Sequence, residues 1–327
     1  MPVGLIKVCV SLIVLVFLAH TAQLNLYLLT KLLSHPVLLI TTFALFILMV
    51  MVNAWRWQRL NTVQRIQLRF NQTAIATYLG TAFNNVLPGS VGGDVVRLFY
   101  LFRHAPQQKS AALLSVFFDR ITGLLGIFIY VSCMTSLHPA LFARNNPLFY
   151  WLITCIGLCA FGMSAFFISL ALPQQMGMSD WLRQRFAANA WSKIVVDFFA
   201  AIRIYRNAKW VILECLLLST IIQMLMVVTL WMITQMMALP LVSFIDFGIA
   251  SAATQIANLI PVTPGGIGVG EMAFANVLQM LNPHVVAAFA TVFMAYRLIG
   301  LIIYLPGVLV YVFNFKLKPM VAVEING

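Results

Sequence analysis

Acidic residues are scarce in this sequence: its 327 residues include eight Asp and Glu against twenty Lys and Arg, and only 9% of the chain is charged. The hydrophobic share is 62%, and the mean hydropathy of +0.96 lies far above that of soluble globular domains. So few charges cannot cover a water-facing surface, which excludes a soluble globular protein. We therefore predict an all-α polytopic membrane protein that forms a single membrane domain over residues 1–327.

Motifs for metal binding and catalysis are lacking as well. The five cysteines all lie in apolar segments, and none forms a CxxC or Cys/His cluster with metal-ligand spacing. There is no Walker lysine, HExxH or GxSxG, and the stretch GGIGVG fails the spacing of a dinucleotide fingerprint. We therefore expect no cofactor, no metal and no enzymatic activity. The net charge of +12 falls in short loops rather than in one patch, so we expect no nucleic-acid partner.

Apolar runs long enough to cross about 30 Å of hydrocarbon predict about six transmembrane helices. Two further apolar segments, about 73–101 and 243–281, are interrupted at mid-length by Pro and Gly. Unpaired backbone is tolerated at membrane depth only where protein or water satisfies it, so these segments predict two re-entrant helical hairpins. The six expected transmembrane helices cover about 4–24, 37–57, 110–134, 148–172, 210–238 and 285–313.

The basic residues predict the orientation. With a cytoplasmic N-terminus, sixteen of the twenty Lys and Arg fall on the inner side and only Lys31 and Arg144 on the outer side. The positive-inside rule therefore predicts a multi-pass protein of the cell (inner) membrane with both termini in the cytoplasm. The residues counted on the inner side are Lys7, Arg56, Arg59, Arg65, Arg69, Arg97, Arg103, Lys109, Arg183, Arg185, Lys193, Arg203, Arg206, Lys209, Lys316 and Lys318.

The two interrupted segments share an ordered set of residues. NNVLPGSVGGDVVR at 84–97 and NLIPVTPGGIGVGEMAF at 258–274 each contain Asn, then Pro-Gly, then a glycine-rich turn and an acid. The acid is Asp94 in the first segment and Glu271 in the second. One such match would be noise, but an ordered set is hard to obtain by chance and indicates an internal repeat.

The correspondence continues beyond the hairpins. Twenty-six residues after each acid comes an arginine inside an apolar segment, Arg120 in the first copy and Arg297 in the second. We therefore predict an inverted 3+3-type repeat with halves at about 1–146 and 147–327, in which the two hairpins are oppositely oriented. The second half includes an aromatic and basic segment, 179–207, that we expect to lie along the cytoplasmic surface of the membrane.

The glycine-rich breaks predict a place where an anion could bind. A break leaves backbone N–H groups of the second half-helix pointing at the loop, and such groups attract phosphate. The glycines would let a lipid phosphate approach closely, or they only permit the turn. The asparagines would bind a headgroup or, more commonly, tie up the loosened backbone. The candidate headgroup-binding residues at the two breaks are Asn85, Gly92, Gly93, Asn258, Gly265, Gly266 and Gly268.

Charged residues inside apolar segments require partners. A charge near the bilayer centre costs roughly 2.5–3.5 kcal/mol, and pairing removes much of that cost. We therefore predict that Asp94 and Glu271 each lie beside Arg120 or Arg297, with helix capping by the acids as the competing interpretation. Asp119 lacks an acidic counterpart in the second copy, so we expect it to face a different partner or the cavity. The charged candidates for headgroup binding are Asp94, Arg97, Asp119, Arg120, Glu271 and Arg297.

The motifs LPGSVGGDVVR and PVTPGGIGVGE, each followed by an arginine inside an apolar segment, resemble the lysylphosphatidylglycerol synthase transmembrane (flippase) family. The resemblance covers nearly the whole chain. It implies a lipid or lipid-linked substrate that is moved between leaflets, with the motifs at its headgroup site. In fused members of this family a soluble C-terminal domain attaches the amino acid, whereas this chain ends soon after its last expected helix and resembles a stand-alone member.

The expected function is therefore that of a flippase for an anionic phospholipid or for a polyprenyl or other lipid-linked substrate. Three alternatives remain open. A small-anion or proton-coupled transporter would take up a soluble substrate, and a membrane-embedded glycosyl- or acyl-transferase would make new lipid without a bilayer. An accessory protein of a lipid-modifying enzyme would co-purify with that enzyme and need none of the intramembrane charges.

Overall fold

The structure is a computed structural model, and regular secondary structure in its described part is entirely helical. The expected helices at 4–24 and 148–172 and the amphipathic segment 179–207 lie wholly or largely outside the described residues. The structure describes residues 25–86, 92–138, 141, 150, 154, 157, 161–162, 164, 205, 208–259, 263 and 266–317.

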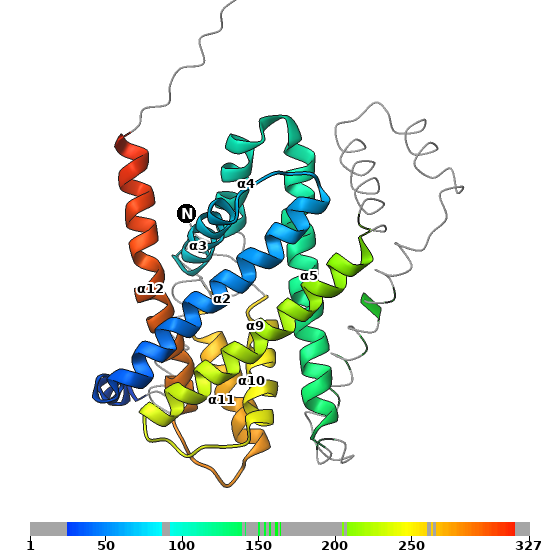
Figure 1. The fold of residues 1–327 in the computed structure, drawn as a ribbon. Coiled ribbons are helices and arrows are strands. Elements are labelled where there is room, and N and C mark those ends of the chain that lie inside the picture. Colours follow the sequence, from blue (N-terminus) through cyan, green and yellow to red (C-terminus); the bar gives the residue numbers. More distant parts are fainter. Residues whose placement is uncertain are drawn as a thin grey trace, which may run out of the picture.

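Among the described residues, four helices are long and apolar enough to cross a membrane (Figure 1). Each overlaps one of the helices predicted at 37–57, 110–134, 210–238 and 285–313, so the polytopic membrane architecture is confirmed in this part of the chain. Their apolar side chains can face lipid because a helix satisfies its backbone hydrogen bonds internally. The four are α2 (Pro36–Val63), α5 (Lys109–Ser136), α9 (Lys209–Met236) and α12 (Phe289–Leu317).

Each interrupted segment forms two shorter helices that pack against each other. The first helix of each pair ends before the Pro–Gly dipeptide of its segment, and proline disfavours continuation of a helix because it lacks an N–H donor. The predicted helix–break–helix arrangement is therefore confirmed, while its re-entrant placement in a bilayer stays a prediction. The first segment gives α3 (Phe70–Val86) and α4 (Gly92–His104), and the second gives α10 (Phe244–Ala257) and α11 (Val269–Leu281).

The helices α2 and α9 pack on each other and connect the rest of the bundle (Figure 1). The helix α2 also contacts α3 and α5, and α9 also contacts α10, α5 and α12. In addition α5 contacts α10, and α12 contacts α3, so each broken pair lies against a long helix from the other half of the chain. The shortest described helices are the 3₁₀ segments η1 (Leu26–Ser34), beside α2, α9 and α12, and η2 (Pro106–Gln108), between α4 and α5.

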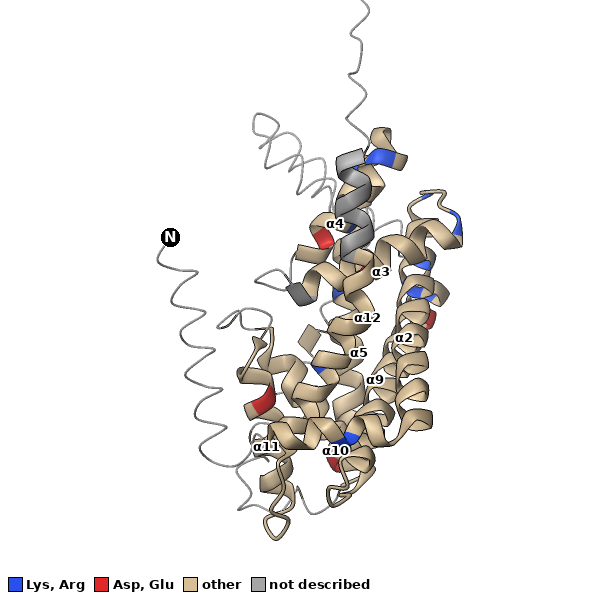
Figure 2. Cartoon of the chain, turned by 90° about the vertical axis from the view of Figure 1, so that its left-hand side faces the viewer, with Lys and Arg blue, Asp and Glu red and all other residues tan. Residues whose placement is uncertain are grey.

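Most of the described helix surface carries no charge, and Lys and Arg gather mainly towards the end of the bundle where α2 is followed by α3 (Figure 2). The hydrophobic core lies where α2, α5, α9, α10, α11 and α12 meet, and its fully buried side chains include Phe247, Phe274 and Phe289. The few acidic side chains are thus surrounded by apolar helices, which makes their contacts decisive for the fold.

Glycine sets the separation of the helices at two crossings. A Cβ atom on Gly126 in α5 would overlap Cβ of Ser219 in α9, and one on Gly248 in α10 would lie 2.6 Å from the hydroxyl oxygen of Tyr130 in α5. Small residues commonly allow such close approach between helices in membranes. The position of α5 against both neighbours therefore depends on these two glycines.

We predict that Gly126→Ala destabilises the protein because the added methyl group forces α5 away from α9, and overpacking of this kind typically costs about 1–3 kcal/mol. The measurement is the apparent melting temperature of the purified chain in detergent. Gly157→Ala is the matched control, because a Cβ there meets no atom of the described residues within 4 Å. Equal melting temperatures for the two variants would contradict the proposed close contact.

Candidate functional site

The acids at the two breaks each contact the arginine that follows 26 residues later. Asp94 on α4 forms an ion pair with Arg120 on α5. Glu271 on α11 forms one with Arg297 on α12, with 3.1 Å between Oε1 and Nε. The predicted pairing is confirmed, and each pair joins the second half-helix of a broken segment to the long helix that follows it.

The two ion pairs differ in accessibility. The exposed fraction of the side chain is 38% for Arg120 and 12% for Asp94, but only 18% for Arg297 and 1% for Glu271. A ligand that approaches from outside therefore reaches the guanidinium group of the first pair more readily than that of the second. The two pairs match in the sequence but are not equivalent as binding groups.

The break of the second segment is held together by its own side chains. The Gly268 N–H donates to Oε2 of Glu271 at 2.7 Å, so this carboxylate caps α11 while it pairs with the arginine. Arg297 Nη2 donates to the Gly266 carbonyl at 2.9 Å and to Oδ1 of Asn258 at 3.3 Å. Gly266 and Gly268 have positive φ angles of 71° and 85°, which favour glycine. Capping and pairing, which were competing interpretations of Glu271, therefore hold together.

The glycine directly before each acid lies in tight contact with an asparagine. A Cβ on Gly93 would come within 2.7 Å of Cγ of Asn84, and one on Gly270 would overlap Arg297 and lie 3.0 Å from the amide of Asn258. Oδ1 of Asn84 accepts a hydrogen bond from the Gly93 N–H at 2.7 Å. At the first break Asn84 ties up a backbone N–H, the commoner of the two roles that the sequence left open, whereas at the second break Asn258 binds the side chain of Arg297.

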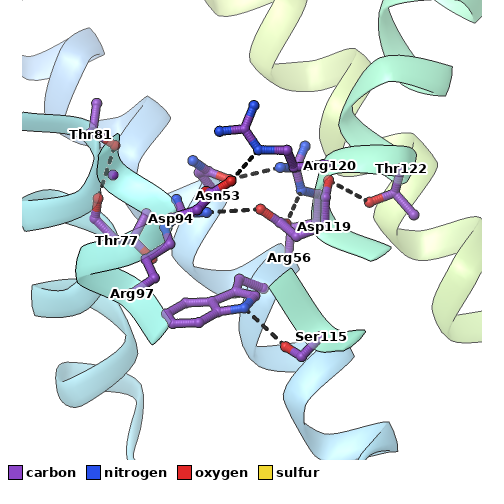
Figure 3. A network of polar contacts seen from close by, with 12 residues as sticks. Asn53, Arg56, Thr77, Thr81, Asp94, Arg97, Ser115, Asp119, Arg120 and Thr122 are labelled. Atoms are coloured by element: carbon purple, nitrogen blue, oxygen red, sulfur yellow. Dashed lines mark hydrogen bonds and ion pairs between the residues drawn. The ribbon is translucent and has the colours of Figure 1, made fainter. Parts of the chain in front are cut away.

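Asp119 lies between two arginines, which are the different partners that the sequence predicted for it (Figure 3). Its Oδ1 accepts from Nε of Arg56 and its Oδ2 from Nη1 of Arg97, each at 2.9 Å. Arg56 also donates to Oγ of Ser219 at 2.9 Å and to Oδ1 of Asn53 at 3.0 Å. The three charged side chains are buried and connect α2, α4, α5 and α9.

Arg56 and Arg97 are therefore not loop charges. The sequence placed both among the basic residues of the inner side, but they lie within α2 and α4 and are only 8% and 6% exposed. A count along the chain does not detect Asp119, the partner of both arginines, which lies 63 and 22 residues away from them. Their assignment to the inner side stays a prediction. Arg56 is also a candidate site residue that the sequence did not indicate.

An aromatic side chain supports the second of these arginines. The guanidinium carbon of Arg97 lies 5.1 Å from the ring centroid of Trp57, within the range of a cation–π contact. The indole N–H of Trp57 donates to Oγ of Ser115 at 3.0 Å, and Ser115 in turn bonds to Asn61. The orientation of Arg97 is thus fixed from α2 as well as from α5.

Two further acids, which the sequence did not single out as site residues, are paired away from the breaks. Glu214 on α9 accepts from Nε of Arg59 at 2.8 Å, in a partly exposed pair. Asp246 at the start of α10 lies 3.1 Å from Nε2 of His138 and accepts from the amide of Asn282 at 3.0 Å. Both contacts lie outside the network of Figure 3.

The remaining candidates are placed only in part. Gly92 begins α4. Gly265 and the side chain of Asn85 lie outside the described part of the structure. Whether any of the candidates contacts a substrate stays a prediction.

The sequence matches the family model described as "Lysylphosphatidylglycerol synthase TM region" over residues 4–307. The chain belongs to this family. Among curated proteins and among solved structures, no match was found. The region that matches the lysylphosphatidylglycerol synthase transmembrane family contains both broken segments and every charged pair described above. Membership places the protein in a lipid-related membrane context.

We predict that Glu271→Gln lowers the apparent melting temperature in detergent far more than Glu214→Gln. Glutamine can still cap α11, so the first change mainly leaves Arg297 as a buried unpaired charge, which costs about 3–5 kcal/mol. The second change breaks a partly exposed pair, for which the cost is about 0–1 kcal/mol. Adding Arg297→Gln to the first variant removes the unpaired charge and should restore part of the loss. Similar shifts for the two single variants would refute the buried pair.

Proposed function

We propose that this protein moves a membrane lipid or a lipid-linked substrate between leaflets and binds an anionic headgroup where its helices break. Membership of the family supports the lipid-related context. The observation that carries the proposal is the matched pair of broken helices, each with an acid at the start of its second half that pairs with an arginine of the next long helix. Broken helices in two corresponding halves form the binding sites of many secondary transporters.

We also propose that the two broken segments belong to an inverted repeat. The helices α4 and α11 both have 13 residues and begin 177 residues apart. The packing partners correspond as well: α2 contacts α3 as α9 contacts α10, α4 contacts α5 as α11 contacts α12, and α3 contacts α12 as α10 contacts α5. A contact pattern that maps onto itself in this way supports a two-fold relation between the halves.

Alternating access gives this arrangement a mechanism. Two oppositely oriented hairpins would open one shared site first to one leaflet and then to the other, while the acyl chains stay in lipid. Arg120 or Arg297 would attract the headgroup, and the paired acid would hold that arginine when no headgroup is bound. Arg120 is the more accessible of the two arginines and would make the first contact. In this proposal the protein is a transporter and not an enzyme.

The proposal is tested by measuring the movement of labelled lipids in proteoliposomes. The panel contains an anionic phospholipid, a zwitterionic phospholipid and a polyprenyl phosphate. We expect Arg120→Ala combined with Arg297→Ala to slow movement about tenfold or more, because a hydrogen bond to a charged group contributes about 1.5–3 kcal/mol. Arg59→Ala is the control, since Arg59 belongs to the partly exposed pair with Glu214 and should leave the rate unchanged.

Other results would favour the alternatives. Unchanged movement in the double variant would contradict the roles of both arginines. If the folded wild-type protein moves no lipid of the panel, a partner that co-purifies with it would favour the accessory function. New lipid formed in detergent would favour a transferase, and uptake of a soluble anion into the vesicles would favour an anion transporter.

A further inference from the structure

The two halves differ in chemistry at corresponding positions. The residues that stand 177 positions after Arg97 and Asp119 are Phe274 and Tyr296. The ring of Phe274 is fully buried and packs against Phe293 with 5.5 Å between centroids, and Phe293 stacks on Tyr296 with 5.8 Å between centroids. A second ion pair therefore holds α4 on α5, whereas aromatic packing occupies the same place between α11 and α12.

The first half also carries excess positive charge. Arg56 and Arg97 share one carboxylate, that of Asp119, so this buried triad has a net charge of +1. In the second half Glu271 and Arg297 match one to one. A guanidinium charge without its own counter-charge is costly among apolar helices, and an anionic ligand would remove that cost. Within the described part of the chain, this excess of buried positive charge is found at the first break.

The buried triad lies next to the first ion pair, which is more accessible. Arg120 follows Asp119 directly in α5, and its side chain is 38% exposed. Its partner Asp94 lies one helical turn before Arg97 in α4, so the five charged groups form one cluster (Figure 3). Guanidinium groups present paired N–H donors that fit the oxygens of a phosphate group.

The second break offers less to an anion. The Gly268 N–H, which would be the natural donor at the start of α11, is already bound by the carboxylate of Glu271. The guanidinium group of Arg297 donates to the Gly266 carbonyl, so part of its hydrogen-bonding capacity serves the loop. An anion would have to displace an acid that is 1% exposed.

We propose that the first broken segment alone binds an anion and that this anion is a phosphate-type oxyanion. The site is the three-arginine cluster, defined as Arg56, Arg97 and Arg120 with Asp94 and Asp119. The second broken segment is its structural counterpart and binds no anion. This inference rests on the proposed function for the idea that the oxyanion belongs to a lipid headgroup, whereas the cluster itself would bind a free phosphate by the same chemistry.

The test compares two matched double variants of the full chain in detergent. Asp94→Asn with Arg120→Gln, and Glu271→Gln with Arg297→Gln, each remove one neutral ion pair and create no new unpaired charge. The probes are a short-chain phosphatidylglycerol and inorganic phosphate, and binding is measured by calorimetry and by the ligand-induced rise in melting temperature. We expect the first variant to bind the lipid about tenfold more weakly or worse, and the second to bind within about twofold of wild type.

A third variant tests the excess charge, because Arg97→Gln makes the triad neutral while both ion pairs at the breaks stay intact. It should also weaken lipid binding about tenfold. Equal weakening in the two double variants would overturn the assignment to the first segment. Inorganic phosphate that binds as tightly as the lipid would overturn the lipid headgroup as the source of the oxyanion.

The outcome separates this inference from the proposed function. Lipid binding that depends on the first segment, in a protein that moves no lipid in proteoliposomes, would sustain the site and refute the transport. If the wild-type protein moves lipid but both double variants weaken lipid binding equally, the transport function holds. The assignment of anion binding to the first segment is then refuted.

Discussion

Charge placed among apolar helices needs a counter-charge, and this requirement determines much of how the helices of this protein contact each other. Of the eight acids in the sequence, five lie in the described part of the chain, and each of them lies beside a basic side chain. The contacts join α2 to α5 and α9, α4 to α5, α11 to α12, and the end of α5 to α10. Since removing one partner of a buried pair is far more costly than removing both, each pair also fixes which helices lie together.

A broken helix adds a second requirement, because the N–H and C=O groups at the break lose their helical partners. Here the charged side chains satisfy both requirements at once. Glu271 binds the Gly268 N–H as well as Arg297, and Arg297 binds the Gly266 carbonyl as well as the acid. A headgroup that took the place of such an acid would therefore compete with the group that stabilises the loop. Binding at a break would be coupled to the conformation of that break for this reason.

The sequence predicts the broken segments and the pairs within them because these depend on local chemistry and regular spacing. Proline and glycine mark the breaks. An isolated charge is costly among apolar helices, so Asp94 and Arg120 are expected to pair with each other. The triad of Asp119 depends instead on how α2 packs against α5. Arg56 stands at the end of an expected transmembrane helix, where a basic residue is usually solvated, so its burial follows from tertiary contacts that a count of charges cannot detect.

The unlike chemistry of the two halves bears on which half can rearrange. Arg97 and Arg120 lie in one network with two carboxylates, so either guanidinium group can change its partner while remaining compensated. Aromatic contacts such as that between Phe274 and Phe293 cannot exchange in this way, because separating the rings exposes apolar surface and gives no new contact in return. Motion that follows the binding of a headgroup would therefore cost less at the first break than at the second. In the proposed repeat, α4 would therefore move relative to α5 at a lower cost than α11 relative to α12.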